Sequence, residues 1–203
     1  MPDLHLEREC GGLVAGIDEV GRGPWAGPVV AAAVILNVDM MPDDLADTID
    51  DSKKLSAPRR EAIAHRLTSC ARIGIGAATI AEIGELNILG ATFRAMARAV
   101  DALGITPDLA LVDGNRPPPL SCPVTTVIKG DSVSLSIAAA SIVAKVMRDR
   151  IMARLSLRYP EFGWERNAGY GTAQHRAALE RVGVTPHHRK TFAPIKALLD
   201  PRC

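Results

Sequence analysis

The sequence predicts an α/β fold. Short apolar runs that are typical of buried strands alternate with longer segments whose apolar residues recur at helical spacing. Three of the apolar runs lead into acids beside a glycine, at Asp18-Glu19, at Asp113 and at Asp131. One such acid is weak evidence, because Asp-Gly is a common turn. Three together favour a functional site, since ligands bind beyond the carboxyl ends of the strands in open α/β sheets.

The composition limits the class of protein. With 203 residues, the chain is most simply one domain, with at most a small appendage. The formal charge of +1 excludes a polybasic protein, so a nucleic-acid partner would have to be met by a local basic patch. The four cysteines include no CxxC pair, which argues against a zinc site and gives no disulfide framework. We therefore expect reduced cysteines in a cytoplasmic protein, and no apolar run is long enough to span a bilayer.

The glycine-rich turn near the N-terminus is the stretch around which the rest is organised. Asp18 and Glu19 stand between an apolar run and two glycines, Gly21 and Gly23. Adjacent carboxylates repel each other and resist desolvation, and a bound cation would neutralise both. Neighbouring side chains of a strand point to opposite faces, so the acids can share an ion only if the chain bends, which the glycines allow. Arg22 adds a charge suited to a phosphate; the alternative is an ordinary acidic turn with a solvated arginine.

The next segments alternate between strands and helices. Residues 29–36 suit a strand buried on both faces. Ser56 and Pro58 predict the start of a helix, in the N-cap and first-turn positions. The lysines before it, Lys53 and Lys54, form either a solvated loop or a phosphate contact. The buried face of this helix is expected to consist of Ile63, Leu67 and Cys70.

A half-buried strand is expected at residues 72–80, where apolar residues alternate. Asn87 is expected to cap the following helix, and Gly104 to end it. Strands near residues 107–113 and 124–128 then lead into the later acids. The buried side of the strand at 72–80 is expected to be Ile73, Ile75, Ala77 and Thr79.

The longest helix is expected between Ile137 and Leu157. Its alanines and serines would let it lie close against the sheet. Most of the cations of its C-terminal half are interpreted as a solvated face that also suits the helix dipole. They are Lys145, Arg148, Arg150, Arg154 and Arg158.

The C-terminal segment presents Tyr170 in a turn between two glycines, followed by a helix that Thr172 caps. A basic loop at residues 185–192 precedes a last short helix. The adjacent His187 and His188 suggest a metal site, but neighbours in a loop seldom converge on one ion. We expect this loop to contact phosphate or to be merely solvated.

Seven stretches occur in a fixed order: GIDEVGRGPWAGPVV from Gly16, DSKKLS from Asp51, LVDGN from Leu111, KGD from Lys129, AASIVAKVMRD from Ala139, GYGT from Gly169 and HRKTF from His188. Together they resemble the motifs of prokaryotic ribonuclease HII, the type 2 ribonuclease H. The resemblance extends from about residue 16 to residue 192, and the set is far more specific than any single motif.

The resemblance implies a ribonuclease H-like fold, in which helices flank a mixed central sheet. It implies one catalytic domain over residues 1–203, with residues from about 160 to 203 as a small helical appendage that binds substrate. The implied activity is endonucleolytic: hydrolysis of the RNA strand of RNA–DNA hybrids, and nicking on the 5′ side of ribonucleotides embedded in duplex DNA. The products would be 3′-hydroxyl and 5′-phosphate ends, in ribonucleotide removal during replication and repair.

The resemblance also implies roles for individual residues. The metal-binding, catalytic acids would be Asp18, Glu19, Asp113 and Asp131. The remaining matched positions would bind substrate: Gly21, Arg22 and Gly23 by reading the 2′-hydroxyl, Tyr170 by packing on the next sugar, and Lys53 and Lys54 by contacting phosphate. The chain departs from the family at Ala168, where a basic residue often stands, so one phosphate contact would be absent.

The chemistry of phosphodiester hydrolysis agrees with these roles. The reaction requires an activated water, an in-line geometry and a stabilised leaving oxygen, and two divalent ions provide all three. Mg²⁺ suits carboxylate ligands and keeps several waters, and Mn²⁺ should substitute for it. We expect a monomer that acts on RNA–DNA hybrids and on DNA duplexes containing ribonucleotides, with no membrane partner.

Two rival functions stay open. The first is another metal-dependent phosphoryl-transfer enzyme on the same fold, which the ribose-reading turn disfavours. The second is a non-catalytic nucleic-acid-binding protein. Loss of one acid would be its signature, and all four acids are present.

Overall fold

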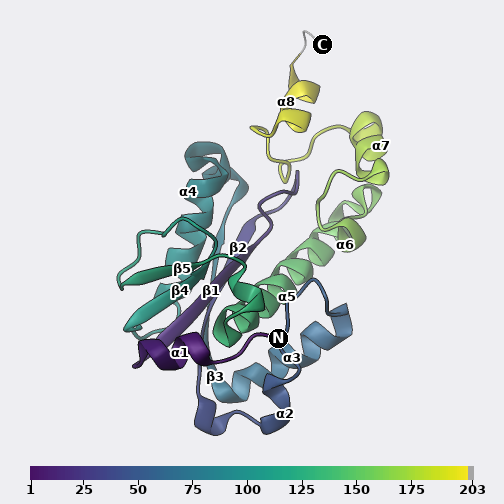
Figure 1. Ribbon diagram of the computed structural model, residues 1–203. Helices are drawn as coiled ribbons and strands as arrows, with labels where there is room; N and C mark the ends of the chain where they lie inside the picture. The colour runs from purple at the N-terminus through teal and green to yellow at the C-terminus, as the bar shows by residue number, and fades with distance from the viewer. Residues whose placement is uncertain (201–203) are drawn as a thin grey trace.

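The computed structural model describes residues 1–200, which form a five-stranded mixed sheet flanked by helices (Figure 1). The strand order is β3-β2-β1-β4-β5. β1 pairs with β4, and β4 with β5, in parallel, whereas β2 is antiparallel to both of its neighbours. The α/β prediction is therefore confirmed. The strands are β1 (Val14–Val20), β2 (Val29–Leu36), β3 (Ala71–Ala78), β4 (Leu109–Asp113) and β5 (Val124–Val127).

The two faces of the sheet are covered by different helices (Figure 1). Alternate residues of β2 belong to two separate cores: Ala31 and Ala33 pack with α4 (Ile80–Asp101), while Ala32 and Val34 pack with α3 (Ala57–Cys70) and α5 (Leu135–Arg158). β2 is apolar throughout because both of its faces are buried, as the continuous apolar run predicts. The shorter elements are α1 (His5–Cys10), η1 (Val38–Met40), α2 (Asp43–Ala46), η2 (Gly130–Ser132), η3 (Pro160–Phe162), α6 (Trp164–Asn167), α7 (Ala173–Val182) and α8 (Ala193–Leu199).

The buried side of β3 differs from the prediction. The isoleucines of this strand are only half-buried, and they pack toward α3 and α5. The fully covered side carries Gly74 and Gly76, on which α4 lies directly. A Cβ on Gly74 would lie 2.0 Å from the Ala99 carbonyl oxygen, so only glycine permits this approach. The alternating pattern was right, but the assignment of its faces was wrong.

Helix boundaries follow the predicted caps with two differences. α4 begins at Ile80, earlier than expected, and breaks at Asn87 (φ 60°), whose Oδ1 accepts hydrogen bonds from the Leu89 and Gly90 N–H groups. Asn87 therefore caps the second half of α4. Ser56 occupies the N-cap of α3, but its side chain makes no capping hydrogen bond. Thr172 caps α7, as predicted.

Helix α5 crosses the sheet and continues to the C-terminal elements (Figure 1). Its alanine-rich first half is almost wholly buried, as expected from its small side chains. Farther along, Met152 joins Ala26, Trp164 and Ile195 in a separate core beneath η3, α6, α7 and α8. This core connects the C-terminal elements to the glycine-rich turn after β1. Within the described residues, no helix is both long and apolar enough to cross a membrane.

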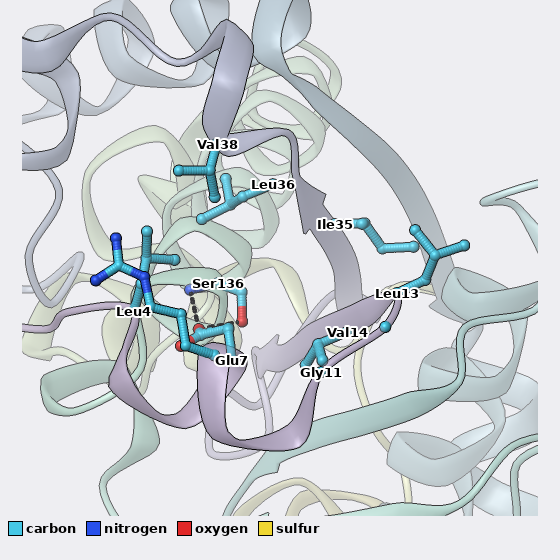
Figure 2. A pocket seen from close by; sticks show the side chains of 11 residues that line it. Leu4, Glu7, Gly11, Leu13, Val14, Ile35, Leu36, Val38 and Ser136 are labelled. Carbon is cyan, nitrogen blue, oxygen red and sulfur yellow. Dashed lines mark hydrogen bonds between the residues drawn. The ribbon is translucent and has the colours of Figure 1, made fainter.

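A hollow of about 270 Å³ lies beside α1, at the amino end of β1 (Figure 2). Its walls are mostly apolar, and the Glu7 carboxylate beside it accepts a hydrogen bond from the Ser136 N–H at 2.9 Å. Glu7 thus places a negative charge in the first turn of α5, where the helix dipole favours it. Asp18 and Glu19 lie toward the other end of β1, so this hollow is separate from them.

Candidate active site

Asp18 and Glu19 lie within β1, which continues to Val20 before the chain turns at Gly21. The expected bend at the two acids is therefore wrong; it comes after them, where Gly21 adopts φ +94°. Strand geometry directs the two carboxylates to opposite faces. Asp18 interacts with Ser141 of α5, whereas Glu19 lines a hollow of about 260 Å³ together with residues of α4.

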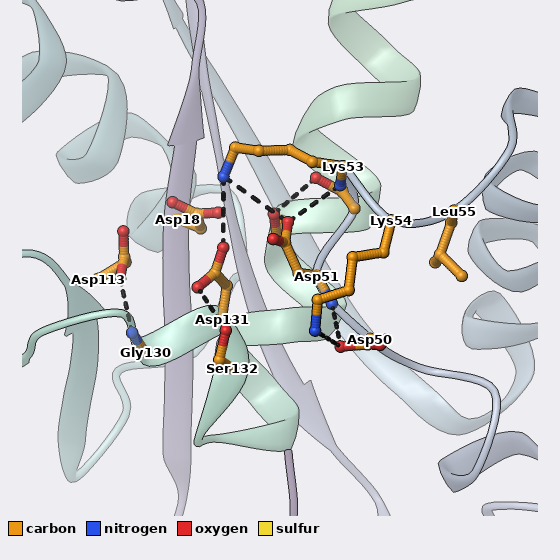
Figure 3. Close-up of polar contacts among 12 residues, drawn as sticks. Asp18, Asp50, Asp51, Lys53, Lys54, Leu55, Asp113, Gly130, Asp131 and Ser132 are labelled. Carbon is orange, nitrogen blue, oxygen red and sulfur yellow. Dashed lines mark hydrogen bonds and ion pairs between the residues drawn. The ribbon is translucent and has the colours of Figure 1, made fainter. Parts of the chain in front are cut away.

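The other two acids come from the neighbouring parallel strands. Asp113 ends β4, and Asp131 lies in η2, which begins three residues after the end of β5. The Asp113 Oδ1 accepts a hydrogen bond from the Gly130 N–H at 2.7 Å, which ties the end of β4 to the turn that carries Asp131. Asp18, Asp113 and Asp131 thus lie at the same edge of the sheet (Figure 3). The prediction that three strands bring acids to one edge is confirmed.

The acids are held in an environment that disfavours their charge. Burial raises the pKa of Asp18 well above its usual value, and repulsion from Glu19 and Asp113 adds to the effect. Burial likewise raises the pKa of Glu19 and of Asp113. The Glu19 Oε2 atom is buried without a hydrogen-bond partner. A nearby cation would relieve both the repulsion and this unpaired oxygen.

The donor set fits a hard divalent cation, because it consists of carboxylate oxygens. Within residues 1–200, however, no three His, Cys, Asp or Glu side chains lie close enough to hold an ion by themselves. Asp18 and Glu19 point to opposite faces of β1, so these two neighbours do not form one ion site together. Water and substrate oxygens would have to complete the coordination of a bound ion, as is usual for Mg²⁺.

The two lysines before α3 behave differently from each other (Figure 3). The Lys53 Nζ lies 3.4 Å from Asp131 Oδ2 and 3.6 Å from Asp51 Oδ1, so its charge faces the acids. Lys54 instead pairs with Asp50 at 3.0 Å. The Lys53 side chain is 77% exposed and free to reorient toward a ligand.

Two buried arginines hold the turn that follows β1. Arg148 of α5 donates to the carbonyl oxygens of Pro28, Ala168 and Ala26. Arg189, in the C-terminal loop, donates to those of Gly27, Arg22 and Gly21. Neither guanidinium pairs with a carboxylate in the described part of the chain. Burial lowers the pKa of Arg148 to about 10 and that of Arg189 to about 9, so both stay charged at neutral pH.

Arg189 also determines where the N–H groups of the turn point. In a trans peptide unit the C=O and the following N–H point in opposite directions. Because the carbonyls of Gly21 and Arg22 point toward Arg189, the N–H groups of Arg22 and Gly23 point away from it. Arg22 and Gly23 are exposed, and neither N–H has a hydrogen-bond partner among residues 1–200. The turn therefore presents two adjacent donors to a ligand.

Tyr170 lies directly against this turn. A Cβ on Gly23 would be 3.3 Å from the Tyr170 Cε1 atom, and the tyrosine side chain stays half exposed. The Trp25 N–H donates to the Gly169 carbonyl, which joins the tyrosine loop to the turn. Arg22 completes this surface, with its Nη1 atom 3.3 Å from Glu19 Oε1. The structure thus brings together Gly21, Arg22, Gly23 and Tyr170.

Three functional candidates were missed from the sequence. Most cations in the second half of α5 are exposed, as expected, but Arg148 is only 1% exposed. Arg189, from the basic loop expected to contact phosphate or to be solvated, is also 1% exposed. His188 does not act with its neighbour His187; it pairs with the buried His175 at 2.9 Å between Nε2 atoms. The signal available for Arg148 was its helical spacing: it stands four residues after Ala144 and four before Met152, both of which are buried.

The sequence of the chain matches one family of known proteins over most of its length. The family described as Ribonuclease HII matches residues 15–195. Ribonuclease HII of Paramagnetospirillum magneticum is 63% identical over 195 residues, which cover 96% of this chain and 97% of that protein. Its counterpart from Rhodospirillum rubrum is 60% identical over 201 residues, covering 98% and 92%.

Solved structures show the same relationship. The ribonuclease H2 of Pyrococcus horikoshii aligns with a TM-score of 0.75 at 28% identity, covering 91% of this chain and 96% of that one. The ribonuclease HII of Archaeoglobus fulgidus, solved in a complex with PCNA, aligns with a TM-score of 0.74 at 28% identity, covering 89% and 95%. The expected ribonuclease H-like fold is confirmed. The chain belongs to the ribonuclease HII family, and it is an endonuclease of the ribonuclease H class.

Proposed function

We propose that this protein is a metal-dependent endoribonuclease that nicks DNA duplexes on the 5′ side of embedded ribonucleotides and hydrolyses the RNA strand of RNA–DNA hybrids. The products carry 3′-hydroxyl and 5′-phosphate ends, and the cellular role is ribonucleotide removal in the cytoplasm during replication and repair. One observation supports this most strongly: the acid-lined sheet edge adjoins a turn that presents two unpaired N–H donors beside Tyr170. That turn gives the site a means of recognising ribose.

The four acids would hold Mg²⁺ or Mn²⁺, with two ions bound when substrate is present. Bound ions would supply an activated water and would stabilise the leaving oxygen. The proposed role is supported by the positions of Asp18 in β1 and Asp113 at the end of β4, and by the hydrogen bond from the Gly130 N–H that fixes Asp113. Repulsion among the buried carboxylates favours cation binding over an empty site.

Recognition of the substrate would rest on the turn and the C-terminal elements. The 2′-hydroxyl is the group that distinguishes a ribonucleotide within DNA, and it both donates and accepts hydrogen bonds. The N–H groups of Arg22 and Gly23 can donate to its oxygen, while Tyr170 packs on the neighbouring sugar. Lys53 and Lys54 would contact phosphates. The appendage proposed from about residue 160 to 203 includes Tyr170; its residues 201–203 lie outside the described ones.

The test is cleavage of short labelled duplexes that differ only in which positions carry ribose in place of deoxyribose. We compare a DNA duplex carrying one ribonucleotide, the same duplex without it, and an RNA–DNA hybrid, each with Mg²⁺, with Mn²⁺ and with chelator. The proposal predicts a metal-dependent nick 5′ of the single ribonucleotide, cleavage of the hybrid and an intact DNA duplex. Equal cleavage of the all-DNA duplex would favour a general nuclease, and binding without any nick would favour a nucleic-acid-binding protein.

A further inference from the structure

A buried histidine pair connects the C-terminal loop to Tyr170. His175 lies in the first turn of α7, His188 lies in the loop before α8, and both are fully buried. Their Nε2 atoms are 2.9 Å apart, which requires one nitrogen to donate and the other to accept. Phe162 and Trp164 pack around both rings.

The neighbours of the pair specify which nitrogen of each ring carries the proton. The Thr185 backbone N–H donates to His188 Nδ1 at 3.0 Å, so that nitrogen is an acceptor. Neutral His188 therefore carries its proton on Nε2 and donates to His175 Nε2. His175 in turn carries its proton on Nδ1, which lies 2.9 Å from the Tyr170 carbonyl oxygen and donates to it. The chain of hydrogen bonds has one direction, from Thr185 to Tyr170.

The surroundings of both rings disfavour the charged form. Burial lowers the pKa of His175. Burial, together with the repulsion that a protonated His175 would exert, lowers the pKa of His188 to about 4. His187, which precedes His188 in the chain, also lowers the pKa of His188 by charge repulsion. If His188 Nδ1 were protonated, its N–H would face the Thr185 backbone N–H, and two donors would oppose each other.

We propose that His175 and His188 are positioning residues that set the selectivity of the site for ribonucleotides, by fixing the Tyr170 backbone against the Gly21–Gly23 turn. This inference rests on the proposed function, because it assigns its purpose to the contact between Tyr170 and substrate. The loop around His188 also holds the turn itself, since the Gly27 N–H donates to the His187 carbonyl and the Arg189 N–H to the Trp25 carbonyl. One loop thus positions both halves of the ribose-reading surface.

Two substitutions of His175 separate the two hydrogen bonds of its ring. His175→Asn keeps a donor near Nδ1, toward Tyr170, and removes the acceptor for His188. His175→Gln keeps the acceptor near Nε2 and removes the donor toward Tyr170. Tyr170→Ala gives the full loss of the tyrosine, and His65→Gln, at an exposed position of α3, is the matched control.

The experiment measures the dissociation constants of matched duplexes with and without one ribonucleotide, in chelator so that no cleavage occurs. For His175→Gln, we expect the preference for the ribonucleotide duplex to fall about 5-fold, the scale of one lost hydrogen bond, while affinity for the all-DNA duplex is unchanged. His175→Asn should lose less of the preference than His175→Gln, because it keeps the donor toward Tyr170 and loses only the support of His188. If His175→Gln preferred the ribonucleotide duplex as strongly as the wild type does, the proposal would be overturned, even if the variant were less stable to heat. No preference in the wild type would instead contradict the proposed function.

A second measurement needs no variant and covers the case in which His175→Gln does not fold. Nitrogen-15 imidazole spectra of the wild-type protein at neutral pH report the tautomer of each histidine. The proposal requires the proton on Nδ1 of His175 and on Nε2 of His188. The opposite tautomer at His175 would leave the Tyr170 carbonyl without its donor and would contradict the proposal.

Discussion

The Asp113 carboxylate accepts a hydrogen bond from the Gly130 N–H at 2.7 Å, so the acid that ends β4 is fixed to the turn that carries Asp131. The Gly114 N–H donates to the Val127 carbonyl in the same connection. These two hydrogen bonds fix the end of β4 against the end of β5, so that Asp113 and Asp131 both lie near Asp18 of β1 (Figure 3). Every prediction about the acid cluster depends on this fixed arrangement.

Asp18→Asn should stabilise the metal-free protein and abolish cleavage. The folded state raises the pKa of Asp18, so the ionised carboxylate opposes folding at neutral pH, and this penalty disappears as the pH falls through the raised pKa. Removing the charge should therefore increase the free energy of unfolding of the metal-free protein. Urea unfolding in chelator measures it, with the exposed Asp39→Asn as control. A destabilised Asp18→Asn protein would contradict the electrostatic account.

Lys53→Met should strengthen metal binding and weaken hybrid binding. The Lys53 ammonium lies 3.4 Å from Asp131 and competes with a cation there, but it is largely exposed. We expect about a 2- to 5-fold gain in Mn²⁺ affinity by calorimetry, the scale of an exposed ion pair. Lys54→Met is the matched control for the Mn²⁺ titration alone, because Lys54 pairs with Asp50 and not with the acid cluster. If the two substitutions changed the Mn²⁺ affinity equally, the Lys53 ammonium would not compete with a cation at the acids.

Arg189→Lys should loosen the ribose-reading turn while keeping the positive charge. A lysine can replace only part of the fork that donates to Gly21, Arg22 and Gly27, and it leaves buried carbonyls unpaired. We expect a loss of about 2–3 kcal/mol in unfolding free energy and a reduced preference for ribonucleotide duplexes. The exposed Lys190→Ala serves as control. If Arg189→Lys preferred ribonucleotide duplexes as strongly as the wild type does, Arg189 would not be needed to maintain the ribose-reading turn.

Acid should destabilise the protein through His188. Its pKa is lowered to about 4 in the folded state, so the unfolded chain binds the proton first as the pH falls. Stability from this group is therefore complete above the unfolded pKa of about 6.5 and is lost as the pH falls toward about 4. Thermal unfolding between pH 7 and pH 4 should show a shallower decline in His188→Asn than in the wild type. Parallel declines would assign the acid sensitivity to other groups.

Local patterns in the sequence were enough to predict the strands, the long helix and the acids at one sheet edge. These features depend on residues close together in the chain: apolar runs, caps and Asp-Gly turns. The prediction failed where partners are distant. Arg148 contacts the Pro28 carbonyl across 120 residues, and Arg189 contacts the Gly21 carbonyl across 168. A charged side chain on a helix or in a loop is normally solvated, and only the fold shows that backbone carbonyls surround these two.

The buried face of β3 was wrongly predicted for a related reason. Isoleucines at alternate positions predict the buried face of an isolated strand, but the closer helix packs on the face without side chains. The distance between α4 and β3 is a property of the whole sheet and is not encoded in the alternation.

The most direct test of the account is single-turnover cleavage by Asp113→Asn of a duplex carrying one ribonucleotide, with Mg²⁺ and with Mn²⁺. The substitution removes one charge and keeps an oxygen that can accept from Gly130. The account predicts that the rate falls by about 1,000-fold or more, while the dissociation constant for the duplex in chelator stays within about 3-fold of the wild-type value. A variant that binds the duplex and still nicks it at a rate near that of the wild type would contradict the role of the acid cluster in catalysis.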